Sequence, residues 1–154
     1  MYTRGTLAAL LMVSVIWTML LLPAHSQETG VAIDKEAAKL VGRWVIIQTK
    51  EPGKPYTDGY KGQSFVTEGP NAFSLIMEYR KDGTFRRISR AGQKEKVIQG
   101  KWVLSGHELR HKREGSSEDE VMYIRFDSPD SFTYIEVYEA TRDPGLFARF
   151  KRLN

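Results

Sequence analysis

The sequence contains no cysteine among its 154 residues. Thiol catalysis, iron–sulfur clusters, thiolate zinc sites and disulfide bonds are therefore excluded. A lipoprotein anchor is excluded as well, because it requires a cysteine at the cleavage site. The folded domain must be held together by its hydrophobic core.

Histidine is also scarce, with three residues, and two of them lie in the segment His107-Glu108-Leu109-Arg110-His111. This segment matches the H-E-x-x-H motif of zinc proteases, which functions on a helix, where the two Cβ atoms lie about 6 Å apart. On a strand the same residues would lie about 13 Å apart. The segment follows a Ser-Gly turn signal and is expected to be the return strand of a hairpin, so we expect no metal site.

The sequence has no recognisable serine–histidine–acid triad, phosphate-binding loop or closely spaced pair of carboxylates. We therefore expect no enzymatic activity and no cofactor. The formal net charge of +4 is small and by itself indicates no particular partner.

Only one long hydrophobic run is present. The chain is uncharged from Gly5 to Ser26 and apolar from Leu7 to Leu22, with Arg4 before this run and small residues before Gln27. The pattern predicts a secretory signal peptide over residues 1–26, cleaved before Gln27. An uncleaved N-terminal membrane anchor is the alternative, but this run rises about 24 Å as a helix, against roughly 30 Å of hydrocarbon core. We expect a secreted or periplasmic protein that does not bind nucleic acid.

The rest of the chain is expected to form one domain. Residues 27–37 are interpreted as a tether and the start of a short helix, and residues 38–154 as a β-barrel domain. Asp34 is a suitable N-cap for the helix, and Gly42 a suitable end.

A long loop is predicted over residues 50–72, which are rich in glycine and proline. Loops of this length inside a compact domain are often lids or binding loops. Tyr56, Tyr60 and Phe65 could fold over an opening, and a short strand is possible over residues 64–67. A mobile loop without a function is the alternative, with equal weight.

From Phe73 onward, apolar residues alternate in short runs separated by turn signals. Phe85 and Ile88 have opposite parity, so a bulge near Arg86-Arg87 is expected to bury both. The chain thus predicts an all-β fold, an eight-stranded antiparallel up-and-down barrel with a short N-terminal helix.

Four segments carry a resemblance to a known family. Gly42-Arg43-Trp44 resembles the G-x-W signature of the lipocalins. The segments Tyr79–Phe85, Gly100–Leu104 and Phe150–Leu153 resemble the bacterial lipocalin-like domains. The likeness covers about residues 38–154, without a T-D-Y-type second motif and without a disulfide.

The resemblance implies that the last strand of the barrel pairs with the first. It also implies that Trp44 lies at the closed end, covered by an arginine from the end of the chain. Arg152 is favoured over Arg149, because it shares parity with the apolar residues of the last strand. Smaller relatives can fill their interiors with side chains, so the resemblance allows either an open cup or a filled barrel.

Charged residues admit two interpretations. A basic cluster could meet an anionic envelope surface or an acidic protein, or form a solvated face partly neutralised by nearby acids, which is the favoured interpretation. The cluster comprises Arg80, Lys81, Arg86, Arg87, Arg90, Lys94, Lys96, Arg110, Lys112 and Arg113.

Three other charged residues, Glu78, Arg125 and Glu136, lie in apolar strands and face either the lumen or the solvent.

The leading functional hypothesis is an exported lipocalin-like protein that binds a small apolar or amphipathic molecule, such as a lipid. The alternative is a filled barrel that acts as an envelope structural or protein-interaction module through its basic face. The expected ligand-lining residues are Phe65, in the lid, and Met77, Tyr79, Trp102, Met122 and Ile124.

Overall fold

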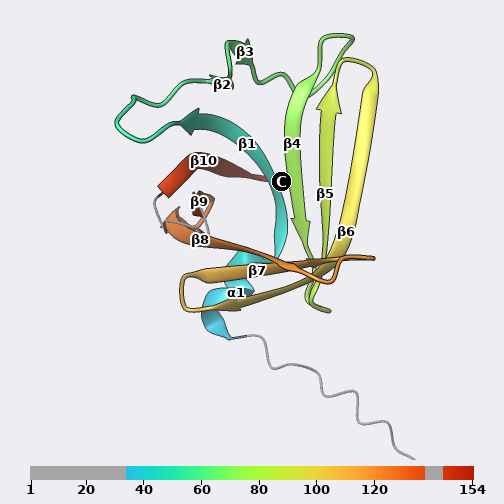
Figure 1. Cartoon of the computed structure of the whole chain (residues 1–154), viewed down its shortest axis with the longest axis vertical. Helices are drawn as coiled ribbons and strands as arrows, with labels where there is room; N and C mark the ends of the chain where they lie inside the picture. The colour runs from blue at the N-terminus through green and yellow to red at the C-terminus, as the bar shows by residue number, and fades with distance from the viewer. Residues whose placement is uncertain (1–33, 138–143) are drawn as a thin grey trace, which may run out of the picture.

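The computed structural model describes residues 34–137 and 144–154 (Figure 1). The interpretations that concern the signal peptide and the tether up to residue 33 lie outside these residues. Within them no helix is long and apolar enough to cross a membrane.

Eight strands form a closed antiparallel barrel in the order β1-β10-β9-β8-β7-β6-β5-β4. The predicted barrel and its short N-terminal helix are therefore confirmed. A two-stranded hairpin of β2 and β3 lies between β1 and β4 in the sequence. The elements are α1 (Lys35–Leu40), β1 (Gly42–Lys50), β2 (Gly59–Tyr60), β3 (Gln63–Ser64), β4 (Phe73–Tyr79), β5 (Thr84–Ala91), β6 (Lys94–Ser105), β7 (Glu108–Arg113), β8 (Asp119–Ser128), β9 (Ser131–Val137) and β10 (Pro144–Leu153).

The helix α1 closes one end of the barrel. The Asp34 carboxylate accepts a hydrogen bond from the Glu36 amide at 3.1 Å and so caps the helix, as expected. Leu40 is fully buried. Its carbonyl accepts a 2.8 Å bond from the Trp44 indole, so the helix is fastened to β1.

The first and last strands close the ring. β1 pairs with β10 from Arg43 opposite Leu153 to Lys50 opposite Phe147, with an irregularity between Ile46 and Gln48. β1 also pairs with β4, but only from Gly42 to Val45. One edge of β1 is therefore fully paired, and the other is paired over half its length.

The closed end of the barrel is packed with large side chains. Trp44 meets the edge of the Phe132 ring, at 4.8 Å between centroids, and Phe132 stacks on Phe150 at 5.0 Å. The buried core also contains Leu40, Met77, Tyr79, Phe85, Trp102, Leu104, Leu109, Met122 and Ile124.

A second, smaller cluster lies on the other face of the sheet and corrects one prediction. β4 and β5 pair without a register shift from Phe73 opposite Ala91 to Tyr79 opposite Phe85, so there is no bulge at residues 86–87. Phe85 belongs to the interior core, whereas Ile88 packs with Val45 and Ile76 on the outside. The predicted bulge is wrong because both faces of this sheet bury apolar side chains.

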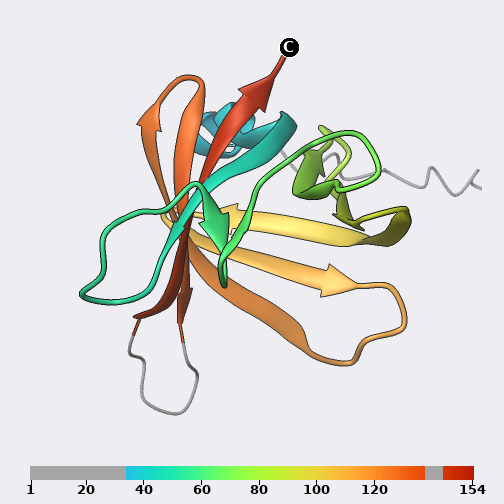
Figure 2. The ribbon, with the colours of Figure 1, turned by 90° about the horizontal axis from the view of Figure 1, so that it is seen from above.

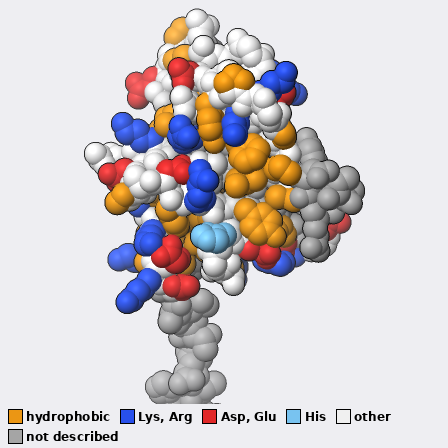
Figure 3. Space-filling view, turned by 90° about the vertical axis from the view of Figure 1, so that its left-hand side faces the viewer, with side chains coloured by type: hydrophobic (Ala, Val, Ile, Leu, Met, Phe, Trp, Pro, Cys, Tyr) orange, Lys and Arg blue, Asp and Glu red, His pale blue; other side chains and the backbone are white. Residues whose placement is uncertain are grey.

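Another apolar area lies on the outside of β8 and β9. Val121, Tyr123, Ile135 and Val137 line a groove there of about 710 Å³. Figure 3 shows hydrophobic side chains gathered on one face of the molecule, next to a histidine.

The barrel opens at the end opposite α1. β6 pairs with β5 over its first eight residues but with β7 only from Gly100 to Ser105. Residues 73–75 of β4, 88–91 of β5 and 94–99 of β6 therefore form a three-stranded extension beyond the closed ring. Figure 1 shows these strands standing beyond the others, and Figure 2 shows the ring from above.

Candidate ligand-binding cup

A cavity of about 750 Å³, here called the cup, lies between the end of β1, the three-stranded extension and the segment that links β1 to β4. This linking segment, residues 51–72, is called the lid segment. Its apolar walls come from Ile46, Phe65, Phe73, Leu75 and Leu146. The polar and remaining lining residues are Thr49, Tyr60, Ser74, Ser89, Arg90, Ala91, Lys94, Glu95 and Lys96.

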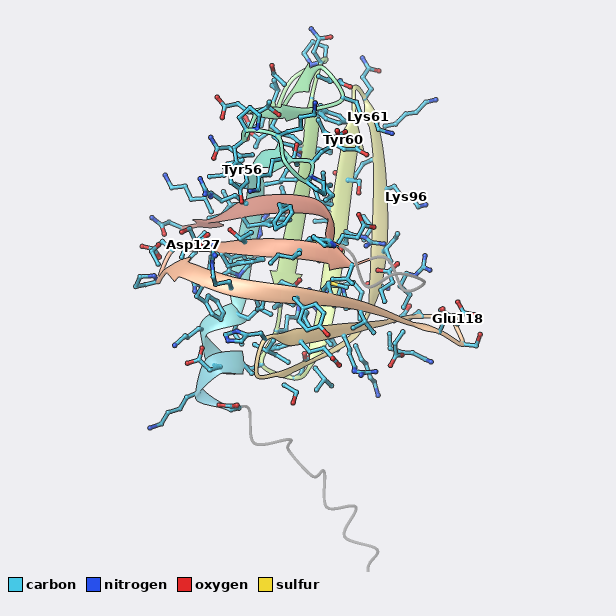
Figure 4. The ribbon with its side chains drawn as sticks, turned by 60° about the vertical axis from the view of Figure 1, so that its left-hand side comes forward. Tyr56, Tyr60, Lys61, Lys96, Glu118 and Asp127 are labelled. Atoms are coloured by element: carbon cyan, nitrogen blue, oxygen red, sulfur yellow. The ribbon has the colours of Figure 1, made fainter. Side chains whose placement is uncertain are left out.

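The predicted long loop forms one side of this cavity. Val66 pairs with Phe73 in an isolated bridge, and the Phe65 ring stacks on the Phe73 ring with centroids 5.6 Å apart. Tyr60, which Figure 4 labels, lies on the same segment and lines the cavity. The sequence prediction of a possible strand at 64–67 corresponds to β3 and this bridge.

Polar contacts fasten the lid segment to β1. Thr49 pairs with Thr57, and the Thr49 hydroxyl donates a hydrogen bond to the Gly59 carbonyl. The Phe65 amide donates a 3.0 Å bond to the Asp58 carbonyl. The aromatic side chains are therefore held by backbone contacts at the mouth of the barrel.

A charged network lies on the inward-facing rows of β5, β7 and β8, and its side chains are partly exposed to solvent. Arg87 donates two hydrogen bonds to Glu120, at 3.0 and 3.4 Å. Arg113 lies 3.1 Å from the same carboxylate. The two guanidinium groups and the carboxylate form one network, which neutralises part of the interior charge.

His111 lies beneath this network. Its ring stacks on Phe85 at 4.2 Å between centroids, and it is 1% exposed. Burial, with a further contribution from Arg87, lowers the pKa of His111 to about 3. The imidazole is therefore neutral at physiological pH, and among the described residues neither of its nitrogens has a hydrogen-bond partner.

Tyrosine hydroxyls in the interior are held in the neutral form as well. Burial, and then the charge of Glu136, raise the pKa of Tyr134 to about 12. Burial also raises the pKa of Tyr79 well above its ordinary value. None of these groups is activated for acid–base chemistry near neutral pH.

Residues 108–111 of the H-E-x-x-H segment lie on β7 and not on a helix, as expected. His107 is in the exposed turn before β7, whereas His111 is inside the barrel. Across residues 34–137 and 144–154, no group of three or more His, Asp or Glu side chains is placed to hold a metal ion.

The structure separates the six expected ligand-lining residues. Phe65 lines the cavity. Met77, Tyr79, Trp102, Met122 and Ile124 face the interior but lie in the packed core, at 1–5% exposure, and do not line the cavity. These five residues belong to the packed core below the cavity, so contact between them and a ligand stays a prediction.

Several lining residues were missed because parity along a strand does not reveal depth in the barrel. Leu75 shares a face with Met77 one step nearer the mouth, and Lys96 shares a face with Trp102. Alternation along β4 and β6 could have identified both residues as interior. Only the register of neighbouring strands places them at the cavity.

Trp44 and Arg152 lie together at the closed end, in the arrangement that the resemblance implies. The Arg152 guanidinium is 4.1 Å from the centroid of the Trp44 ring. It also donates hydrogen bonds to the carbonyls of Val41 at 2.9 Å and Lys39 at 2.8 Å. Gly42 has φ of +141°, and a Cβ at this position would overlap the Arg152 guanidinium.

Most of the basic cluster is paired with acids on neighbouring positions, in agreement with the favoured interpretation. Lys81, Lys94 and Lys96 are the members without a carboxylate at ion-pair distance in the described residues. The pairs are Arg80 and Arg86 with Glu78, Arg87 and Arg113 with Glu120, Arg90 with Glu95, Arg110 with Glu108, and Lys112 with Asp119.

Three other charged residues were expected to face either the lumen or the solvent. Glu78 and Arg125 face outward, and Arg125 pairs with Asp127 at 3.0 Å. Glu136 shares the interior face with Met122 and Tyr134. It does not line the cavity.

These features define an antiparallel up-and-down barrel of the lipocalin-like type, packed at one end and hollow at the other. A lipocalin-like protein from Bacteroides uniformis ATCC 8492 has this fold, with a TM-score of 0.52 and 15% identity over 75% of this chain and 99% of that chain. An uncharacterized protein from Bacteroides eggerthii DSM 20697 matches with a TM-score of 0.50 and 11% identity, over 73% and 98% of the two chains.

At these identities the likeness shows the fold alone. No protein-family model and no curated protein matches the sequence. The lipocalin-like barrel inferred from the sequence is therefore confirmed, and membership of a bacterial lipocalin-like family stays a prediction.

Proposed function

We propose that this protein is an exported, non-enzymatic binding protein that holds a small apolar or amphipathic molecule in the cup. The observation that carries the proposal is the cavity of about 750 Å³ with five large apolar side chains in its walls. This volume lies within the range of about 300–1,000 Å³ that is typical of small-molecule sites. The predicted signal peptide supports export.

The alternative, a structural or protein-interaction module, is supported by a different observation. The outer faces of β8 and β9 expose Val121, Tyr123, Ile135 and Val137 along one groove. The basic face gives this alternative less support than expected, because carboxylates neutralise most of it. The packed closed end fits either function.

Binding of an uncharged fluorescent probe, N-phenyl-1-naphthylamine, tests the proposal. The probe should gain fluorescence with the native protein, and Leu75→Trp should reduce the gain by narrowing the cavity. Val103→Trp is the matched control, since Val103 is an exposed residue of β6 at 58% exposure. Native mass spectrometry of the purified protein would identify any ligand that stays bound.

Two outcomes would contradict the proposal. The first is no probe binding by the native protein. The second is binding that Leu75→Trp leaves intact while Val103→Trp reduces it, which would place the apolar site on the outside of the barrel.

A further inference from the structure

The cationic side chains of the cup that have no carboxylate at ion-pair distance in the described residues lie on one strand, β6, whereas Arg90 of β5 also lines the cavity but pairs with Glu95. Lys96 is opposite Ser89, which is opposite Leu75, and these three line the cavity. Lys94 lines it in the next row toward the mouth, opposite Ala91. The wall formed by the first half of β6 therefore carries two positive charges.

These two charges are not neutralised by the side chains around them. Among residues 34–137 and 144–154, neither lysine has a carboxylate at ion-pair distance, whereas Arg87 deeper in the barrel is paired with Glu120. The acidic residue in the cavity lining is Glu95, and its carboxylate lies 2.9 Å from Arg90. Lys81 is in the β4–β5 turn at the closed end, away from the cup.

The opposite walls of the cavity are apolar. Ile46 and Leu146 come from β1 and β10, and Phe65 comes from the lid segment. A molecule that fills this space would meet hydrocarbon on one side and ammonium groups on the other. The lid adds one more positive charge nearby, because the Lys61 ammonium lies 5.2 Å from the centroid of the Tyr60 ring.

The spacing of the lysines suits a single small anionic group. Residues two apart on one face of a strand have Cα atoms roughly 7 Å apart. Both side chains are exposed and flexible, so their ammonium groups can converge on one head group. Figure 4 shows Lys96 at the edge of β6, with the lid residues Tyr60 and Lys61 higher in the view.

We propose that the ligand is a single-chain amphiphile with an anionic head, which Lys94 and Lys96 hold at the rim while its hydrocarbon chain lies in the cup beneath Phe65. The inference rests on the proposed function, because it assigns a ligand class to the same cavity. A carboxylate and a phosphate have the required chemistry in common.

Competition with bound N-phenyl-1-naphthylamine tests this assignment in the native protein. The competitors are laurate, dodecyl phosphate, lauryl alcohol and dodecylamine, each below its micelle-forming concentration, at low and at high ionic strength. We expect at least one of the two anions to bind about fivefold tighter than the alcohol at low salt, and the ratio to shrink as salt screens the charges. The anion with the higher affinity, laurate or dodecyl phosphate, shows whether the head group is a carboxylate or a phosphate.

Variants locate the head group. Lys94→Gln combined with Lys96→Gln should remove the preference for the anion and leave the affinity for lauryl alcohol unchanged. Lys101→Gln combined with Lys151→Gln removes the same charge from exposed positions outside the cup and should keep the preference. Because lysines also discourage pairing between exposed strand edges, each variant is checked for a monomeric state by light scattering, and the single variants replace the double variant if it aggregates.

Each contrary result has a separate meaning. Equal affinity for anion and alcohol, or tightest binding of the amine, overturns the anionic head but leaves the proposed function in place. A preference that survives loss of both lysines overturns their role. A native protein that does not bind the probe or any competitor overturns the proposed function and this inference with it.

Discussion

Arg152 acts on the closed end of the barrel through several contacts at once. Its guanidinium covers the Trp44 ring, bonds two carbonyls at the end of α1, and lies 3.5 Å from the Asp130 carboxylate. The planar guanidinium of arginine has several N–H donors in a fixed arrangement and can make these contacts together, whereas the ammonium group of lysine cannot. The side chain therefore connects the helix, the first strand and the turn between β8 and β9.

Replacing Arg152 with lysine should lower the free energy of unfolding by about 2 kcal/mol, because charge-assisted hydrogen bonds and the contact with Trp44 are lost. Urea unfolding followed by tryptophan fluorescence measures the change. Arg125→Lys is the matched control, since Arg125 is exposed and pairs with Asp127 alone, and it should change stability by less than about 0.5 kcal/mol. Equal effects of the two substitutions would contradict the role of Arg152.

His111 makes the stability of the protein depend on acidity. Its pKa falls from 6.5 in the unfolded chain to about 3 in the fold. The unfolded state therefore binds a proton first as the pH drops, so the contribution of neutral His111 is complete above pH 6.5 and is lost progressively toward pH 3.

His111→Leu should reduce this loss. Between pH 7 and pH 4 the native protein should lose roughly 3 kcal/mol more stability than the variant, because the variant has no imidazole to protonate. Urea unfolding of both proteins at the two pH values gives the difference, and the acidic groups that the proteins share cancel. His107→Leu, at an exposed turn position, is the control. An identical pH dependence of native protein and His111→Leu would show that burial does not suppress the protonation of this residue.

At the scale of elements, β1, β4 and β5 form a sheet with two buried faces. Val45, Ile76 and Ile88 pack together outside the barrel, with Ile47 and Leu153 beside them. This outer cluster explains why the first strand is apolar on both faces.

Ile76→Ala should therefore cost about 3 kcal/mol, as expected for truncation of a buried residue. Val97→Ala is the comparison, because Val97 lies opposite Ile88 in the same outward row but is 42% exposed. Chemical denaturation of both variants should show a clearly larger effect for Ile76. If the two losses are equal, the outer cluster does not contribute to stability.

At the scale of the whole molecule, closure depends on the last strand. β10 pairs with β1 on one side and β9 on the other, and it buries Phe150 against Phe132. A barrel that loses residues 150–153 of this strand exposes the facing edges of β1 and β9 and part of its core at once.

Ending the chain after Arg149 should therefore abolish cooperative unfolding and the near-ultraviolet circular dichroism of the packed aromatic residues. Removal of Asn154 alone is the control, since this residue follows the end of β10 and is exposed. A truncated protein that still unfolds in one cooperative transition would show that the pairing of residues 150–153 with β1 is not needed for a cooperative fold.

Local patterns in the sequence determined much of this architecture. Alternation along residues such as Phe73, Leu75 and Met77 predicted the strands, and short turn signals predicted their antiparallel order. The arrangement of Trp44 and Arg152 at the closed end was implied by the resemblance of Gly42-Arg43-Trp44 to the lipocalin signature. These inferences hold because strand period, turn geometry and helix capping depend on neighbouring residues.

The tertiary structure alone decided which interior residues line a cavity and which charges stay unpaired. Leu75 and Met77 have the same parity, yet one lies at the cup and the other in the packed core. Arg87 and Glu120 are far apart in the sequence and pair across strands, whereas in the cup Glu95 pairs with Arg90 and leaves Lys94 and Lys96 without a carboxylate at ion-pair distance among the described residues. Depth and charge pairing arise from the register between distant strands, because register brings together side chains that no local pattern relates.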